Sequence, residues 1–236
     1  MKIERRKMKK KSKMRKWVED IVFIVCAVLL IRAFIVQAYR IPSGSMEPTL
    51  LIGDQLFACK FFYGIKIPFT DKRILEVREP RQGDIVIFRY PYERKDFVKR
   101  CIAVEGDAVE IKDKSLYVNN KLTTDSYAYF GDPTLYPKLP DLPPSFEYQR
   151  AWEQNEFKNA VRMVRDNFGP VRVPANCIFV MGDNRDFSYD GRYWGPLNKK
   201  WLLGKPLLIH FSWDSKPPLY KIWQKVRWQR MGRIID

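Results

Sequence analysis

The sequence predicts a mostly β fold: a barrel-like domain of antiparallel strands with an inserted cap region, preceded by one N-terminal transmembrane helix. Three observations predict it: five Gly-Asp dipeptides along the chain, short apolar runs near them, and one longer apolar segment close to the N-terminus. Gly-Asp is a turn signal, and short runs separated by turns are typical of all-β domains. With 236 residues, 46% of them hydrophobic, the chain is long enough to bury one sizeable core.

Residues 1–16 form a basic tail. They carry ten Lys or Arg against one acidic residue, Glu4, which is a net charge of +9 out of +16 for the whole chain. Because this charge lies beside an apolar segment, an anionic membrane explains it better than nucleic acid does. Only Arg40 stands just after the segment. The asymmetry predicts a cytoplasmic N-terminus and an exported body.

Residues 17–38 are predicted to be the membrane anchor. The 18 residues from 21 to 38 make about the shortest helix that spans a bilayer, and Arg32 near the far end can snorkel to the interface. A cleaved signal peptide is the alternative, because residues 36–38 resemble a cleavage site. Arg32 and the long basic tail before the segment favour its retention as an anchor. On either interpretation, residues 39–236 form an exported domain.

The strand candidates of this domain are short runs rich in β-branched and aromatic residues. Asn119 and Asn120 separate two of them and predict a tight hairpin turn. Together the runs predict a closed or partly closed barrel-like sheet. They cover residues 55–59, 85–88, 97–104, 109–111, 115–118, 121–123, 178–181 and 207–211.

The pattern changes at about residues 124–170, which we interpret as an insertion or small second domain. Residues 131–144 contain five prolines and predict an extended connection. Apolar residues then recur at helical spacing between 157 and 164, and Gly169-Pro170 follows as a stop signal. The insertion is therefore expected to hold one amphipathic helix.

Four cysteines, Cys26, Cys59, Cys101 and Cys177, are present, and none forms a Cys-x-x-Cys pair. With His210 as the only histidine, the residue set is too small for a zinc site, and we expect no metal. An exported domain can hold one disulfide and leave a free thiol. The sequence does not choose between this pairing and three unpaired thiols.

A nucleophilic serine needs a base, and a histidine base has little support. His210 lies within an apolar run, which favours a structural role, and no Gly-x-Ser-x-Gly motif occurs. Lys99 is the alternative base, in the strand candidate 97–104. Alternation places Phe97, Cys101 and Ala103 on its face, with no acidic partner among them. Burial there would lower the pKa of Lys99 towards neutrality. The ordinary alternative is a strand lysine that reaches solvent.

Two serines lie just past the predicted membrane span. Ser43 and Ser45 flank Gly44, which allows a tight turn and close approach of a substrate, between Pro42 and Pro48. The tripeptide alone is a weak signal, but a nucleophile here would act near the outer membrane face. The densest polar stretch outside the tail follows later, at residues 182–195, and is either a solvated loop or a salt-bridged scaffold that holds neighbouring strands in register. A hydroxyl there, such as that of Ser188, can orient a lysine base.

Five blocks of the chain occur in the order seen in bacterial type I signal peptidases, also called leader peptidases. The first reads Pro-Ser-Gly-Ser-Met-Glu-Pro-Thr-Leu, the fourth begins Val-Lys-Arg, and the last ends Phe-Ser-Tyr-Asp-Gly-Arg. Five ordered blocks after an apolar segment are highly specific, so the chain resembles this family over much of its length. The blocks lie at residues 42–50, 53–54, 83–88, 98–107 and 181–192.

The resemblance implies roles for individual residues. Ser45 matches the family's nucleophile and Lys99 its general base. Ser43 matches the serine that helps the Ser45 N–H stabilise the oxyanion, and Ser188 the hydroxyl that orients the lysine. Three further residues match scaffold positions: Asp183, Asp190 and Arg192.

The chain departs from the family pattern in three places. Gly191 stands where a serine is common, Cys101 follows the Lys-Arg pair, and the Pro-rich insertion has no counterpart that we can align. These departures concern the cap and the pocket. The Ser45–Lys99 pair is unaffected.

The resemblance further implies a membrane-bound endopeptidase that removes signal peptides from exported preproteins. It would sit in the cytoplasmic membrane with its catalytic domain on the outer face, in contact with lipid, and would need no cofactor. The signal segment would lie as an extended strand against a sheet edge. Preferred preproteins, pocket residues, oligomeric state and the role of the insertion stay open.

Two other classes compete with a hydrolase. A membrane-tethered β-domain without catalysis has the same anchor and barrel, but no use for Ser45, Lys99 and Ser188 together. A nucleic-acid binder explains the charge of +16 and the basic, aromatic residues 223–233. The charge, however, concentrates beside the predicted span, and those C-terminal residues fit lipid headgroups better.

Overall fold

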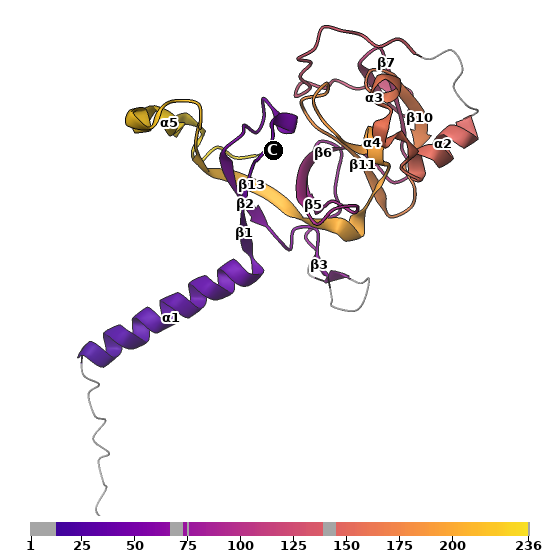
Figure 1. The fold of residues 1–236 in the computed structure, drawn as a ribbon. Coiled ribbons are helices and arrows are strands. Elements are labelled where there is room, and N and C mark those ends of the chain that lie inside the picture. The colour runs from indigo at the N-terminus through magenta and orange to yellow at the C-terminus, as the bar shows by residue number, and fades with distance from the viewer. Residues whose placement is uncertain (1–12, 67–72, 75, 139–144, 236) are drawn as a thin grey trace, which may run out of the picture.

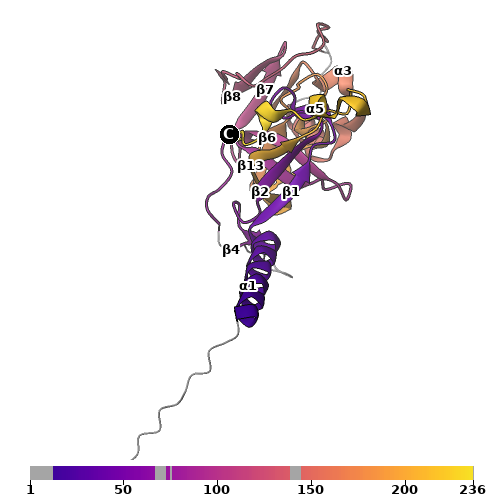
Figure 2. The ribbon, with the colours of Figure 1, turned by 90° about the vertical axis from the view of Figure 1, so that its left-hand side faces the viewer.

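A computed structural model describes residues 13–66, 73–74, 76–138 and 145–235. Most of the predicted basic tail and the prolines at 140, 143 and 144 lie outside these residues. The first helix, α1 (Lys13–Phe34), projects away from the β body in both views (Figures 1 and 2). In the described part of the chain, no helix combines the length and apolar character needed to cross a membrane.

The end of the predicted 17–38 segment is a strand, not helix. β1 (Val36–Arg40) begins two residues after α1 and pairs antiparallel with β2 (Asp54–Cys59), so that Val36 lies opposite Cys59 and Ala38 opposite Phe57. The prediction was wrong here because hydropathy does not distinguish an apolar strand from the end of an apolar helix. Pairing with β2 satisfies the backbone groups on one side of this strand instead.

Seven strands form one antiparallel sheet in the order β1-β2-β13-β5-β6-β11-β12. β13 is the longest and bends across the sheet, pairing with β2 along one part and β5 along another. Gly204 lies at this bend, where a Cβ would collide with the carbonyl oxygen of Cys59. The barrel is open, because β1 and β12 are its two edges. The remaining strands are β13 (Leu202–Ser212), β5 (Ile85–Arg89), β6 (Asp96–Val104), β11 (Cys177–Met181) and β12 (Leu197–Asn198).

A second sheet has the order β10-β7-β8-β9, and β3 (Ile65–Lys66) and β4 (Arg73–Ile74) form a separate pair. The predicted hairpin is confirmed: Asn119 and Asn120 both have positive φ, 52° and 63°, as a type I′ turn requires. The four strands are β10 (Phe168–Arg172), β7 (Ala108–Lys112), β8 (Ser115–Val118) and β9 (Lys121–Leu122).

The helix expected between 157 and 164 is not continuous. The chain forms η2 (Glu156–Asn159) and α3 (Val161–Val164), separated at Ala160, whose φ of −92° and ψ of 43° are not helical. The sequence also missed α2 (Ser145–Glu153), and Gly169-Pro170 lies within β10 instead of ending a helix. The apolar spacing was nevertheless informative, because Phe157 and Val164 are both buried.

Two hydrophobic clusters fill the body. The larger lies among β6, β11, the second sheet and α2, and includes Trp152 and Phe179. The smaller underlies the segment that follows β1, where Met46 and Leu50 are buried. It therefore fixes the backbone on either side of Ser45. Its members are Ile41, Met46, Leu50, Leu56, Ile85, Ile209 and Ile235.

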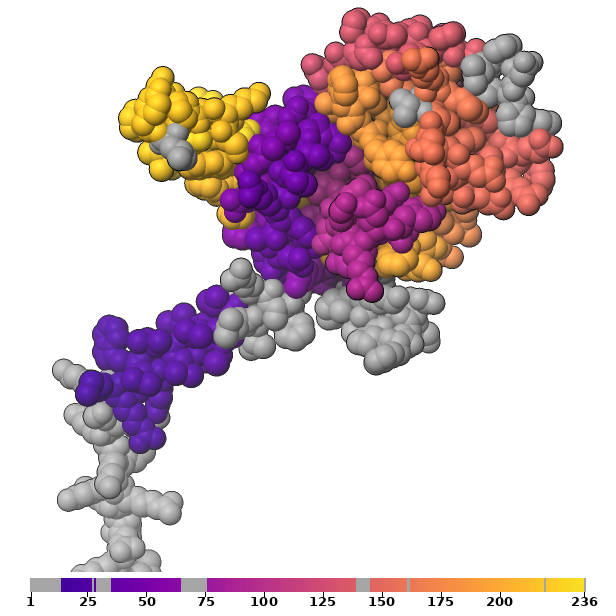
Figure 3. Space-filling view, in the orientation of Figure 1, coloured from indigo at the N-terminus to yellow at the C-terminus, as the bar shows by residue number. Residues whose placement is uncertain are grey.

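The C-terminal segment folds back against this smaller cluster. Arg230 donates from Nη2 to the carbonyl of Thr49 at 2.9 Å and forms an ion pair with the carboxylate of Asp54. In Figure 3 the C-terminal residues, in yellow, lie against the purple region that carries residues 36–60. The segment thus supports the turn that follows Ser45. It contains η4 (Leu219–Lys221), α5 (Ile222–Lys225) and η5 (Trp228–Arg230).

The cysteines are unpaired. Cys59, Cys101 and Cys177 are buried, and Cys26 is exposed on α1. Of the two possibilities that the sequence left open, the structure has free thiols. Cys101 is fully buried, and its Sγ donates to the carbonyl of Ala103 at 3.6 Å. It acts as a small apolar residue of the core.

Candidate active site

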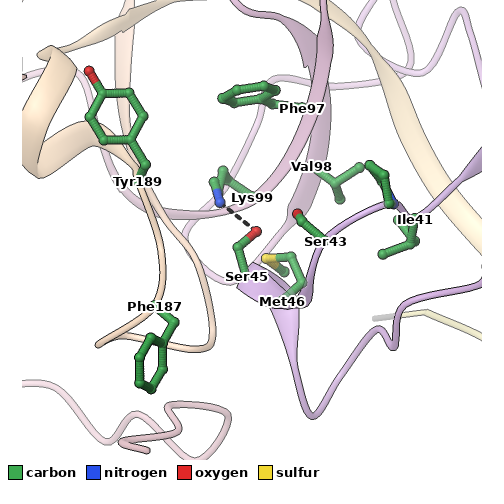
Figure 4. Close-up of a pocket in the computed structure, with 10 residues that line it drawn as sticks. Ile41, Ser43, Ser45, Met46, Phe97, Val98, Lys99, Phe187 and Tyr189 are labelled. Carbon is green, nitrogen blue, oxygen red and sulfur yellow. Dashed lines mark hydrogen bonds between the residues drawn. The ribbon is translucent and has the colours of Figure 1, made fainter. Parts of the chain in front are cut away.

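Three segments far apart in the chain bring Ser45, Lys99 and Ser188 together. Ser45 lies in η1 (Gly44–Met46), Lys99 in β6, and Ser188 in the loop between β11 and α4 (Gly191–Trp194). Hydrogen bonds join Lys99 Nζ to Ser45 Oγ at 2.7 Å and to Ser188 Oγ at 3.0 Å. Figure 4 shows the first of these bonds in the pocket. The arrangement places an amine within direct proton-transfer distance of a hydroxyl.

Lys99 is buried, with 3% of its surface exposed. Burial lowers its pKa to about 8, because a site with little water disfavours the ammonium form, and the nearby Arg192 acts in the same direction. Asp190 and Asp183 oppose this shift from the loop after β11, which strand alternation alone does not reveal. The hydrogen bonds of the amine go to hydroxyls, not to a carboxylate. Lys99 is therefore poised to exchange a proton near neutral pH.

With Lys99 as the general base that the resemblance implies, activity is expected to rise with pH through one ionisation near pH 8, because only the neutral amine accepts a proton. At pH 7, about a tenth of Lys99 is neutral, so kcat/KM is expected to be roughly tenfold below its alkaline plateau. Steady-state assays of the full chain in detergent between pH 6 and 11 measure the profile. A midpoint at the ordinary lysine value of 10.5 would contradict a general-base role for a buried Lys99.

The segment around Ser45 packs against the smaller hydrophobic cluster on one side and faces the pocket on the other. Met46 is buried at 1% exposure, whereas Ser43 is exposed at the pocket. The Ser43 hydroxyl makes no capping bond to η1. Figure 4 shows Ser43 and Ser45 near each other on one side of the pocket. Ser43 therefore lines the pocket beside Ser45.

A pocket of about 230 Å³ lies between these segments. Its walls are mostly apolar, and Phe187 and Tyr189 at its rim are 64% and 40% exposed. A cavity of this size and character fits a small apolar side chain. The pocket lining was not predicted from the sequence, although each lining residue lies within four positions of Ser45, Lys99 or Ser188. Ten residues line it: Ile41, Pro42, Ser43, Ser45, Met46, Phe97, Val98, Lys99, Phe187 and Tyr189.

A buried ion pair shapes the loop that carries Ser188. Arg192 binds Asp190 through two hydrogen bonds of 2.9 Å, and Asp190 also accepts from the N–H of Gly182 at 3.1 Å. Arg192 donates further to the carbonyls of Arg165 and Arg185, at 2.7 and 2.6 Å. Both charges are compensated inside the protein, as buried charges require. The pair closes the loop and orients Ser188.

A second buried pair joins Asp183 to Arg100, with two hydrogen bonds of 2.8 Å. Thr49 Oγ1 donates to the same carboxylate at 2.6 Å. Asp183 therefore ties β6 and the turn after Ser45 to the Ser188 loop. Arg100 and Thr49 were not among the predicted site residues. Their position within the two motifs that hold Lys99 and Ser45 was the available signal.

The insertion supports the same loop. The N–H of Tyr129 donates to the carbonyl of Asp183 at 2.8 Å, and the N–H of Arg185 donates to the carbonyl of Tyr129 at 2.9 Å. An ion pair joins Arg185 to Asp125. The residues at the start of the insertion thus form an extra backbone pairing with the Ser188 loop. This gives the insertion a structural role that its sequence did not indicate.

His210 does not line the pocket. It is half-buried on β13 and stacks on Phe57, with ring centroids 4.1 Å apart. Burial lowers its pKa, and its Nε2 has no hydrogen-bond partner among the described residues. Gly191, one of the three departures from the family pattern, begins α4, where a Cβ would lie 2.8 Å from the carbonyl oxygen of Val180. The close backbone contact explains why glycine fits there.

No group of three or more His, Cys, Asp or Glu side chains in the described residues is arranged to hold a metal ion. An open antiparallel β sheet with a serine hydroxyl bonded to a buried lysine indicates a hydrolase of the serine–lysine class. Residues 14–211 match the family model described as "Signal peptidase, peptidase S26". The chain belongs to this family and is a serine endopeptidase.

Several curated relatives carry the name signal peptidase I. That of Pseudomonas aeruginosa is 34% identical over 212 residues, which cover 81% of this chain and 70% of the relative. That of Bacillus licheniformis is 32% identical and covers 90% of this chain and 96% of the relative. A solved signal peptidase I from Enterococcus faecalis V583 is 26% identical, with a TM-score of 0.34, and covers 54% of this chain and 97% of that chain.

Proposed function

We propose that Ser45 is the nucleophile and Lys99 the general base with which this endopeptidase removes signal peptides from exported preproteins. One observation carries the proposal: the buried amine of Lys99, with its pKa lowered to about 8, lies 2.7 Å from Ser45 Oγ. A lysine acts as a base only when it is neutral at the working pH. The relatives named signal peptidase I support the choice of substrate.

In the first half-reaction, Ser45 Oγ attacks the scissile carbonyl carbon while its proton passes to Lys99 Nζ. The carbonyl electron pair becomes an oxyanion, which the Ser45 N–H and the Ser43 hydroxyl stabilise. The oxyanion then re-forms the carbonyl, the C–N bond breaks, and Lys99 gives its proton to the leaving amine. An ester between Ser45 and the signal peptide remains.

In the second half-reaction, Lys99 takes a proton from a water molecule, whose oxygen attacks the ester carbon. The second tetrahedral intermediate collapses, the C–O bond to Ser45 breaks, and Lys99 returns the proton to Ser45 Oγ. The enzyme regains its starting state and no net proton is left on Lys99. Ser188, bonded to the amine at 3.0 Å, keeps Lys99 oriented through both steps.

The signal segment binds as an extended strand along β6. Residues Phe97 and Val98 line the pocket, and β11 pairs with β6 only from Arg100 onwards. That leaves the backbone of Asp96–Lys99 available on one side for pairing with a substrate. Main-chain pairing accepts many sequences, and the pocket beside Ser45 selects a small side chain before the scissile bond.

Incubation of the purified full chain with a preprotein tests this function. Mass spectrometry of both products maps the cut, which is expected to follow a small side chain at the end of the signal segment. A cut at another position, or no cut by a well-folded chain, would remove the assignment.

The same proposal includes an N-terminal anchor in the cytoplasmic membrane, with the catalytic domain on the outer face. Support comes from the charge of the first 16 residues and from α1, where apolar side chains such as Trp17, Val22 and Phe23 are all more than half exposed. Nothing in the described body covers them. Retention of the chain in membranes washed with alkaline carbonate is the expected result, and its release would contradict an anchor.

A further inference from the structure

We propose that Asn184 is a positioning residue that aims the backbone N–H of Ser45 at the oxyanion. This inference rests on the proposed roles of Ser45 and adds a residue to them. Asn184 was not among the predicted site residues, although it follows Asp183 in the loop after β11. It is buried, with 5% of its surface exposed.

Asn184 holds the peptide units on both sides of Ser45. Its side-chain Nδ2 donates to the carbonyl oxygen of Gly44 at 3.2 Å, and its backbone N–H donates to the carbonyl oxygen of Ser45, also at 3.2 Å. The orientation of the amide is chemically determined, because the Gly44 oxygen can only accept. One residue thus restrains the carbonyl before the nucleophile and the carbonyl after it.

The first of these bonds controls the direction of the Ser45 N–H. That N–H and the Gly44 carbonyl belong to the same planar trans peptide, in which the two groups point in opposite directions. A donor that holds the carbonyl therefore fixes where the N–H points. Gly44 has no Cβ to restrict its own dihedral angles, so the restraint has to come from neighbouring groups. The N–H of Glu47, which donates to the same carbonyl at 3.1 Å, is the other donor.

Asn184 is not one of the residues that orient Lys99 or shift its pKa. The hydrogen bonds of Lys99 go to Ser45 and Ser188, and the carboxylates and guanidinium that shift its pKa belong to Asp190, Arg192 and Asp183. Loss of the Asn184 amide is therefore expected to weaken oxyanion stabilisation and to leave proton transfer intact. A residue that only stabilises the fold would not separate these two effects.

The test compares Asn184→Leu with Asn167→Leu in the full chain. Asn167 is a matched control: it is also buried, and its Nδ2 also donates to a backbone carbonyl, that of Tyr136, at 2.9 Å. For Asn184→Leu we expect kcat to fall about 10- to 100-fold, somewhat less than the loss of an oxyanion donor itself, with little change in KM. The midpoint of the pH profile should stay near 8. Asn167→Leu should lower thermal stability without changing kcat.

A peptide aldehyde with a small terminal side chain provides a second readout. Ser45 Oγ adds to its carbonyl carbon, the proton passes to Lys99, and the carbonyl electron pair becomes an oxyanion. Affinity for the aldehyde should fall with kcat in Asn184→Leu, while affinity for the reduced-amide analogue, which forms no oxyanion, should be unchanged. Equal losses for both ligands, or equal losses of activity in both Asn variants, would overturn the inference.

Asn184→Asp covers the case in which Asn184→Leu does not fold, because it keeps the size and the backbone N–H but replaces the neutral amide donor by a negatively charged acceptor. Folded Asn184→Asp with kcat within twofold of the parent would also overturn the inference. Failure of the proposed function is recognised separately. Cleavage by Ser45→Ala would remove the role of Ser45, whereas inactive Ser45→Ala beside fully active Asn184 variants would remove only the role of Asn184.

Discussion

Replacement of Ser45 by Ala, or of Lys99 by Met, is expected to lower kcat/KM for a preprotein by roughly four orders of magnitude or more. The first change removes the attacking oxygen, and the second keeps an unbranched side chain as far as Cε but removes the amine 2.7 Å away. The double variant should be little worse than either single variant, because the two groups act in one step. Quantification of cleaved product over long incubations measures the residual rates.

Lys112→Met is the control for the lysine change. Lys112 is also a strand lysine, on β7, but its side chain is 55% exposed and paired with Glu110. Its replacement should leave kcat/KM within about twofold, as is usual for surface positions. Substantial cleavage by Ser45→Ala or Lys99→Met would instead show that another pair carries the reaction.

Lys99→Met also has an expected effect on stability, whose sign follows from linkage. The pKa of Lys99 is about 8 in the folded chain and 10.5 as the ordinary value, so the unfolded chain binds the proton more readily. The cost of burying Lys99 is therefore fully present below about pH 8 and is lost as pH rises towards 10.5. Relative to the parent, the variant should gain more free energy of unfolding at pH 7 than above pH 10.5.

Gly182→Ala is expected to reduce kcat/KM by at least about 100-fold, because it displaces the groups that orient Lys99. A Cβ on Gly182 would lie 2.5 Å from the Cβ of Ser188 and would collide with Ser188 Oγ and the carbonyl oxygen of Ser45. No real Cβ makes such contacts, so the Ser188 loop or the Ser45 segment has to move. Steady-state kinetics should show the loss mainly in kcat.

Gly106→Ala is the control for the added methyl group. A Cβ on Gly106 meets nothing within 4 Å, although its φ of +85° makes alanine strained there. This variant should lose some stability and keep its activity. If Gly182→Ala retained normal kcat with an unchanged melting temperature, the close packing between Ser45, Gly182 and Ser188 would have no functional importance.

The sequence predicted most strands of the body because turn residues and apolar runs are local signals. The runs at 55–59, 85–88 and 115–118 correspond to β2, β5 and β8 within one residue at each end. β1 was missed because it continues an apolar helix, and α2 because its burial of Tyr148 and Trp152 depends on the second sheet. Local propensity does not contain that tertiary contact.

The candidate site was partly predictable for a different reason. Three motif blocks contained Ser45, Lys99 and Ser188, and the structure brings these residues together. Thr49 and Asn184 lie in the same blocks but were not selected, because their importance depends on which backbone groups they face across the fold. The pocket lining was unpredictable for the same reason. The hydrophobic periodicity of a segment does not reveal which distant segment it contacts in the fold.

The separation of the site residues along the chain bears on when the enzyme acquires its activity. Ser45 and Ser188 stand 54 and 89 residues from Lys99, and they meet it only through the seven-stranded sheet and the loop after β11. Contacts between such distant residues form late and slowly in folding, because long loops have to close first. The newly made chain is therefore latent: it carries every reacting group but no assembled catalyst until its sheet is complete.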